Sequence, residues 1–192
     1  MKKGHSIFTA LLAFTVCLQM QAASIVTVDM TELYNGYYKT LEANEKIKGS
    51  VKKAEDQTKT LLGEGKALVD EYNEILEMVE NPALTDEAKA KAEQDAKAKI
   101  TEIEAKKAEV SQFQTNMQRS LQQRQRTYRD LFMDEIRGVV LEVSKERNGD
   151  LVLDSSGLTA TGVPAVVYSD PSWDITDIVL ERVNADAPDD DE

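Results

Sequence analysis

The most constraining feature of this sequence is a long run of mainly apolar and small residues spaced alternately three and four positions apart. The run begins at Ile47 and continues without a slip to Val79. This spacing places one narrow stripe along an α-helix and is typical of a coiled-coil seam. Most flanking positions are charged, so the helix is expected to be exposed around most of its circumference. The members of the stripe are Ile47, Val51, Ala54, Thr58, Leu61, Gly65, Leu68, Tyr72, Ile75 and Val79.

A second helix of similar length is predicted after a tight turn. The stripe stops at Asn81-Pro82, where the proline disfavours helical backbone in the residue before it. Thr85 then supplies a hydroxyl cap, followed by two acids at the positive end of the helix dipole. Helices joined by so short a turn run antiparallel, so residues 47–126 are expected to form a hairpin arm with its tip at 80–86. The inner face of the second helix is expected at Ile100, Ile103, Val110, Met117, Leu121 and Tyr128, interrupted by Lys107, Gln114 and Arg124.

Two glycines interrupt the first helix of the arm. Gly63 and Gly65 each cost about 1 kcal/mol relative to alanine in a helix interior. One interpretation is sequence drift in a solvated helix. The other is a hinge that lets the arm bend, and the sequence leaves both open.

The two ends of the chain predict a small mixed body over residues 24–46 and 127–184. Strands are expected at 24–30, 151–153 and 163–168, and a final helix at 175–183. Thr31 is the expected cap of a helix whose broad apolar surface is Leu33, Tyr34, Tyr37, Tyr38 and Leu41. The fold class is therefore α+β and mainly α. Three short strands leave open edges, which favours an oligomer held by Ile25, Val26, Val28, Leu151, Val152 and Leu153.

Residues 1–23 have the pattern of a cleaved secretory signal peptide. A positive start precedes an apolar run from Ile7 to Leu18, too short to span a bilayer, and small residues end at Ala23. His5 and Cys17 would leave with it, so the mature chain has no imidazole or thiol for catalysis or zinc binding. Two lysines also leave, which takes the net charge from −12 to −14 and opposes nucleic-acid binding. We expect no enzyme activity, no cofactor, no metal and no stable membrane insertion, and a disordered acidic tail at 185–192.

Two segments of the body resemble the Skp/OmpH family of periplasmic chaperones. Residues 25–30 and 37–43 resemble its opening, and residues 149–154 and 174–177 resemble its close. The helical hairpin broken at Asn81-Pro82 is also the layout of that family. The resemblance implies a periplasmic homotrimer whose shared strands form a small barrel. Its three arms would enclose a cavity that holds unfolded outer-membrane proteins without ATP.

The net charge of this chain is opposite in sign to the basic surface on which lipopolysaccharide binding in the resembled family depends. Lipopolysaccharide binding depends on a basic surface, and the strongly acidic mature chain does not favour it. A stretch at 111–129 has four arginines and no acid, and is either a solvated helix face or a positive belt for acidic clients. A structural coiled-coil spacer of the cell envelope is the alternative function. The candidate client contacts are Leu62, Met78, Ile100, Ile103, Val110, Phe113, Met117 and Leu121.

Overall fold

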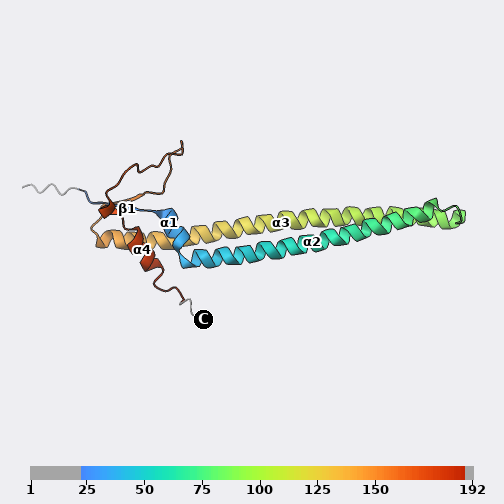
Figure 1. The fold of residues 1–192 in the computed structure, drawn as a ribbon, viewed down its shortest axis with the longest axis horizontal. Helices are drawn as coiled ribbons and strands as arrows, with labels where there is room; N and C mark the ends of the chain where they lie inside the picture. The colour runs from blue at the N-terminus through green and yellow to red at the C-terminus, as the bar shows by residue number, and fades with distance from the viewer. Residues whose placement is uncertain (1–22, 189–192) are drawn as a thin grey trace, which may run out of the picture.

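The computed structural model describes residues 23–188, which form a small body at one end of a long helical arm (Figure 1). The predicted signal peptide and the end of the predicted acidic tail fall on residues 1–22 and 189–192, outside the described part. The predicted mainly helical fold with a small strand component is confirmed. The elements in chain order are β1 (Ile25–Val28), α1 (Met30–Gly36), α2 (Tyr38–Glu80), α3 (Asp86–Glu146), β2 (Leu151–Asp154), the 3-10 turn η1 (Pro171–Trp173) and α4 (Thr176–Val183).

The arm is an antiparallel hairpin of α2 and α3, which lie side by side for most of their length (Figure 1). They contain 43 and 61 residues, which corresponds to about 64 and 90 Å at 1.5 Å per residue. The turn lies where the sequence predicts it. The Asn81 side chain accepts a hydrogen bond from the Ala83 amide at 2.9 Å, and the Thr85 hydroxyl caps α3 by accepting one from the Ala88 amide at 3.3 Å.

The sheet of the body brings together segments from the two ends of the chain. β1 runs parallel to β2, with Ile25 opposite Leu151 and Val28 opposite Asp154. On its other side, β1 forms a bridge from Thr27 to Asp174. β1 is therefore the central segment, and it depends on residues more than 120 positions later in the chain.

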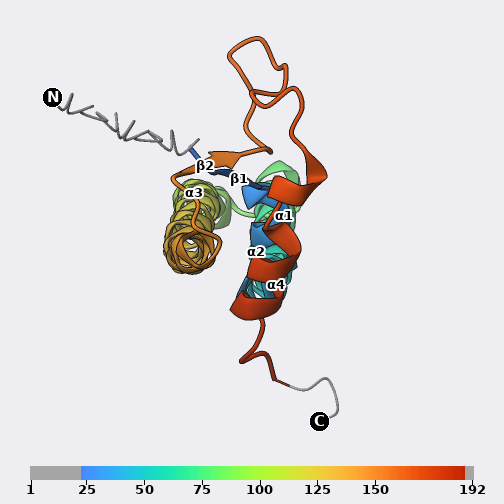
Figure 2. The same cartoon turned by 90° about the vertical axis from the view of Figure 1, so that its left-hand side faces the viewer.

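The predicted third strand at 163–168 is wrong for the described protomer. Three hydrogen bonds join Thr159 and Val163, and in one of them the Val163 amide donates to the Thr159 hydroxyl at 3.2 Å, so this amide is already used within a turn. Pro164 has no amide hydrogen to donate and makes one isolated bridge with Leu158. The segment instead belongs to a loop that projects from the body (Figure 2), with Val167 and Tyr168 86 and 81 % exposed.

The core lies where α1, α4 and the sheet cover the last five turns of α3. Ile136 of α3 is fully buried, as are Leu33 of α1 and Val179 of α4. The predicted apolar surface of the first helices is used in part, because Leu33 and Tyr37 are buried whereas Leu41 is exposed. The buried cluster comprises Val26, Val28, Leu33, Tyr37, Ala43, Phe132, Ile136, Val140, Val143, Ile175 and Val179.

Two helix boundaries in the body show how local hydrogen bonds set the fold. The expected cap Thr31 is wrong, because α1 starts one residue earlier and Asp29 accepts a bond from the Glu32 amide at 2.7 Å. At the end of α3, Asn148 takes a left-handed conformation with φ of 54°. This lets the Gly149 amide donate to the Ser144 carbonyl at 2.8 Å, which closes the helix.

Candidate functional site on the helical arm

The seam predicted for α2 is confirmed at every position. Between residues 51 and 80, each predicted member is buried or half-buried, and every other residue is exposed. Leu61 is the most enclosed, at 6 % exposure. The hydroxyl of Thr58 is satisfied inside its own helix, where it donates to the Ala54 carbonyl at 2.8 Å. The arm is thus held by one narrow stripe, and most of its surface faces solvent.

The inner face predicted for α3 is confirmed at Ile103, Val110, Met117, Leu121 and Tyr128, which are half-buried, and is wrong at Ile100, which is exposed. The predicted interruptions Lys107, Gln114 and Arg124 also face solvent, so they lie outside the seam. The spacing of three and four is regular in α3 from Ala92 to Met117, and it includes two lysines, Lys99 and Lys106, that sequence reasoning did not assign to the seam. The less exposed residues of this stripe are Ala92, Ala96, Lys99, Ile103, Lys106, Val110, Phe113, Met117 and Leu121.

The two seam lysines each bind one glutamate on each helix. Lys99 lies 2.8 Å from Glu71 of α2 and 2.7 Å from Glu102 of α3. Lys106 lies 2.9 Å from Glu64 and 2.7 Å from Glu109. These hydrogen bonds, strongest from Glu102 and Glu109, raise the pKa of both ammonium groups. The pattern repeats after seven residues on both helices, so it fixes one antiparallel register.

Gly65 lies beside the side chain of Lys106. A Cβ atom at this position would lie 3.5 Å from Cγ of Lys106, in ordinary van der Waals contact. Nothing lies within 4 Å of the corresponding position at Gly63, which is exposed on the outside of a continuous helix. The hinge at Gly63 and Gly65 stays a prediction.

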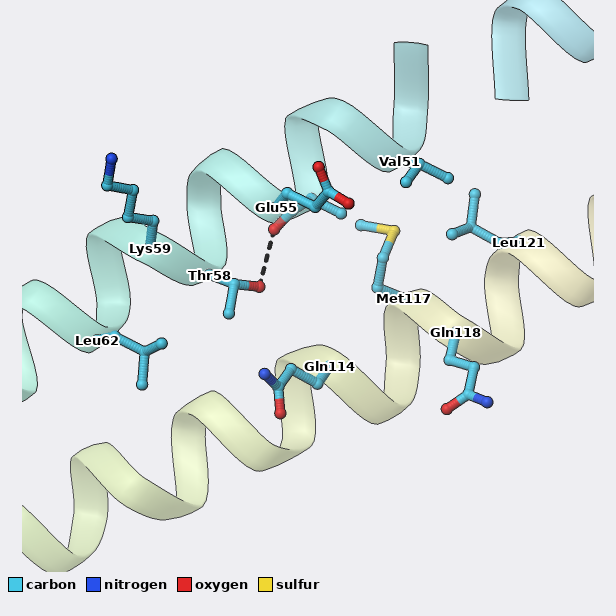
Figure 3. Close-up of a pocket in the computed structure, with 10 residues that line it drawn as sticks. Val51, Glu55, Thr58, Lys59, Leu62, Gln114, Met117, Gln118 and Leu121 are labelled. Carbon is cyan, nitrogen blue, oxygen red and sulfur yellow. Dashed lines mark hydrogen bonds between the residues drawn. The ribbon is translucent and has the colours of Figure 1, made fainter. Parts of the chain in front are cut away.

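Two open grooves run between the helices of the arm. The groove nearer the body has a volume of about 480 Å³, and Figure 3 shows Met117 reaching from α3 toward α2, with Val51 and Leu121 beside it. The second groove, of about 410 Å³, is lined by Leu61, Val69, Ile103 and Val110. Leu62 and Gln114 line both, so the two grooves are continuous along one side of the arm.

The candidate client contacts divide into two groups by their position. Leu62 and Met78 are 56 and 52 % exposed, and Ile100 is also exposed. The remaining five are half-buried members of the seam: Ile103, Val110, Phe113, Met117 and Leu121. The second group therefore serves the hairpin itself, and some of its members also form groove walls.

A polar cluster joins the base of the arm to the body. The Tyr37 hydroxyl donates to Glu135 at 2.6 Å, and the Lys39 ammonium donates to the same oxygen at 2.9 Å. These two hydrogen bonds, that of Tyr37 first, lower the pKa of Glu135. Burial, followed by the bond to Glu135, raises the pKa of Tyr37. The cluster ties the start of α2 to α3 where the arm leaves the body. Sequence reasoning missed it because its three residues are 96 and 98 positions apart.

The candidate oligomerisation residues also divide into two groups. Val26 and Val28 are buried inside the protomer's own core, and Ile25 and Val152 are half-buried. Leu151 and Leu153 are exposed on β2. Trp173, the chain's one tryptophan, is also exposed. The exposed apolar side chains of the body therefore lie on β2 and the segment that follows it, and also on α3 at Leu131 and Leu141.

The described residues contain no cluster of side chains suited to binding a metal ion. None of the helices formed by residues 23–188 has the length and apolar content needed to cross a membrane. Asp29 follows β1 and Asp154 ends β2, and their carboxylates accept hydrogen bonds from the amides of Glu32 and Ser156. Both are therefore turn and cap residues.

The geometry defines a class of protein with a long coiled-coil arm, open apolar grooves and a small mixed body. The sequence matches the family model described as Outer membrane protein (OmpH-like) over residues 24–183. The chain belongs to this family, which confirms the resemblance found from its sequence. No curated protein matches the chain significantly.

Proposed function

We infer that this protein is an ATP-independent periplasmic holdase that binds unfolded outer-membrane proteins along its arms. The observation that carries this proposal is the continuous apolar groove between α2 and α3, open to solvent and flanked by exposed Leu62. Unfolded β-barrel chains expose aliphatic and aromatic side chains, and each contact with such a groove is weak. Several contacts made at once give avidity without sequence specificity. Membership of the OmpH-like family supports the same function.

The body is proposed to assemble three copies of the chain, so that three arms surround one cavity. Leu151 and Leu153 present apolar side chains next to a short two-stranded sheet with an open edge. Val167 and Tyr168, in the loop that projects from the body, are 86 and 81 % exposed. A second copy would cover these side chains and pair the open edge.

A structural spacer is the second candidate, and the regular seam of α3 favours it. A spacer needs a tight seam and no spare apolar surface. The seam meets the first condition, because its spacing stays regular through Lys99 and Lys106, and Lys107, Gln114 and Arg124 lie outside it. The second condition is not met, because apolar residues are exposed along the groove.

The holdase proposal is tested by replacing exposed apolar residues of the arm. The triple variant Leu62→Gln, Met78→Gln, Ile100→Gln leaves the seam intact, and glutamine is a good helix former. We expect faster aggregation of an unfolded β-barrel protein diluted from urea, measured by light scattering. The control Leu131→Gln, Leu141→Gln changes similarly exposed leucines on the body part of α3. Equal effects of both variants would contradict the proposal.

A charge-based account of client binding predicts a different result. Replacing Arg119, Arg124, Arg126 and Arg129 with glutamine removes the positive stretch at 111–129 and retains helix propensity. We expect this variant to hold clients nearly as well as the unmutated protein. If it loses holding while the apolar variant keeps it, the arm binds by charge and the spare apolar surface is not the client site.

Assembly is tested by the mass of the native protein in solution. Leu151→Asp, Leu153→Asp places charges on the exposed face of β2, where they are costly only once a second copy covers them. We expect a folded monomer from this variant and a trimer from the unmutated chain. Val28→Asp is the contrasting variant, because burial of Val28 in its own protomer predicts loss of folding as well as of assembly. A monomeric unmutated protein would contradict the model.

A further inference from the structure

Charge is divided along the arm. The half nearer the body, residues 47–59 and 111–126, has seven Lys and Arg against two Asp and Glu. The half nearer the tip, residues 60–110, has seven Lys against thirteen Asp and Glu. The arm as a whole therefore carries only −1 of the −14 of the mature chain. We call the two parts the basic half and the acidic half.

The exposed apolar surface of the arm differs between the same two halves. The basic half contains the groove of about 480 Å³ with Val51, Met117 and Leu121 on its walls. The acidic half presents protruding side chains, of which Met78, Leu76 and Ile100 are exposed. Met78 borders a hollow lined by Glu71, Glu74, Asp95 and Glu102, and also by Lys99, which pairs with Glu71 and Glu102. The charged residues that line the groove of the basic half are Glu55 and Lys59, and those that line the groove of the acidic half are Lys66, Lys106 and Lys107. The opposite net charges of the two halves therefore come from residues outside the two grooves.

We propose that the arms of two copies of this chain dock antiparallel, with the acidic half of each on the basic half of the other. An antiparallel overlap makes both halves of the contact identical, as a two-fold interface requires. It also brings the six excess negative charges of one arm next to the five excess positive charges of the other. Complementary charge of this kind speeds association and fixes orientation.

The charge division argues against a parallel contact. Arms that leave a common body side by side run parallel, so basic half faces basic half and acidic half faces acidic half. Such arms repel along their whole length, within a screening distance of about 8 Å at physiological salt. Attraction therefore acts between arms that approach tip-first from separate bodies. This inference does not depend on the proposed holdase function.

The test uses two sets of charge reversals at exposed positions. The base set is Lys52→Glu, Lys53→Glu, Arg119→Glu, Arg124→Glu, and the tip set is Glu74→Lys, Glu77→Lys, Glu80→Lys, Glu93→Lys. Within the described residues, none of the eight side chains makes an ion pair, so the hairpin should be retained, as far-UV circular dichroism would show. Each set reverses the sign of the half that carries it.

Sedimentation velocity at 20 mM and 300 mM NaCl then measures association of the full mature protein. We expect association at low salt, weakened at least about tenfold by either set alone and restored when the two variants are mixed. The proposal would be overturned if either variant alone still associated as strongly as the unmutated protein. It would also be overturned if the mixture of the two variants associated no more strongly than each variant alone. An unmutated protein that does not associate beyond its body assembly at low salt would overturn it as well. If a charge-reversed variant loses helicity, two milder variants replace it: Arg119→Gln, Arg124→Gln in the basic half, and Glu74→Gln, Glu77→Gln in the acidic half. Each of these should weaken association at low salt, and no mixing experiment is then needed.

Cross-linking determines the direction of docking. Residues 23–188 contain no cysteine, so Met78→Cys and Leu121→Cys each introduce a single thiol. Antiparallel docking predicts that a mixture of the two variants forms a mixed disulfide faster than either variant forms its own. Preferential formation of the two symmetric disulfides would show parallel contact and contradict the inference.

Discussion

The body and the arm are stabilised in different ways. In the body, large side chains such as Leu33, Ile136 and Val179 are completely removed from water. In the arm, the fully buried positions are Leu61 and two small residues, Ala92 and Ala96, while the rest of the seam is half-exposed. Burial of apolar area contributes about 25 cal/mol per Å², so the body gains far more free energy per residue. The arm should therefore open locally at free energies well below that of global unfolding.

The largest test of this difference removes the arm. Deleting residues 47–126 and joining the ends with a short flexible linker retains the whole buried cluster of the body, including Ala43 and Phe132. We expect the remaining protein to fold and to keep its assembly, because those contacts do not use the arm. It should no longer suppress client aggregation. An unfolded product, or one that still holds clients, would show that the two regions are not independent.

A smaller test compares one cavity in each region. Ile136→Ala should lower the free energy of unfolding by about 2–5 kcal/mol, as expected for a fully buried aliphatic side chain. Leu61→Ala removes a similar side chain from the narrow seam, where water can reach the space, and should cost less. Urea denaturation followed by circular dichroism measures both. A larger loss from Leu61→Ala would contradict the difference in packing.

The seam lysines provide a third test, confined to the arm. Lys99→Leu, Lys106→Leu replaces half-buried ammonium groups by apolar side chains and should make local opening of the arm rarer. We expect slower amide hydrogen exchange in residues 60–75 and a weaker dependence of that exchange on salt. Lys91→Leu, Lys97→Leu is the control, since it changes charge equally at exposed positions. Faster exchange in the seam variant would mean that the ion pairs hold the hairpin together.

The smallest expected effect concerns acid stability at the junction of arm and body. The pKa of Glu135 is lowered in the folded protein, so its carboxylate contributes stability above its ordinary pKa of about 4.5. That contribution is lost as pH falls through the lower folded value. Glu135→Gln should lower the free energy of unfolding at pH 7. It should also make the decrease of that free energy between about pH 5 and pH 3 less steep than in the unmutated protein. The effect is small because the side chain is about one-third exposed. Unchanged acid dependence in urea midpoints would contradict this role.

The success of sequence reasoning also differed between regions, for a physical reason. The seam of α2 was predictable at each position because apolar residues repeat at a fixed spacing. In α3 the spacing is just as regular, but Lys99 and Lys106 occupy seam positions and Ile100 lies outside. A signal was present: Glu64 and Glu71 repeat with the same seven-residue period, and each lysine is followed by a glutamate three positions later.

In the body, the elements were predictable and their pairing was not. The strand at 25–28 consists of β-branched residues, and the strand at 151–154 has Val152 between two leucines, but their parallel pairing depends on contacts across more than 120 residues. The false strand at 163–168 has the same apolar composition. It differs because the Val163 amide is used in a turn, which no residue pattern announces. The assembly and the client contacts stay predictions for the same reason, since both depend on partners outside one protomer.

Asn184 connects the end of the chain to the start of the arm. Its side chain accepts a bond from the Tyr38 amide at 2.9 Å and donates to the Gly36 carbonyl at 3.0 Å, across 146 and 148 residues. β1 likewise needs β2 and the start of α4 before its hydrogen bonds exist. Because such distant contacts form slowly and late, a chain emerging N-terminus first can complete its hairpin arm but not its body. β1 is thus synthesised before the arm but is fixed in the fold after it, when nearly the whole polypeptide has been released.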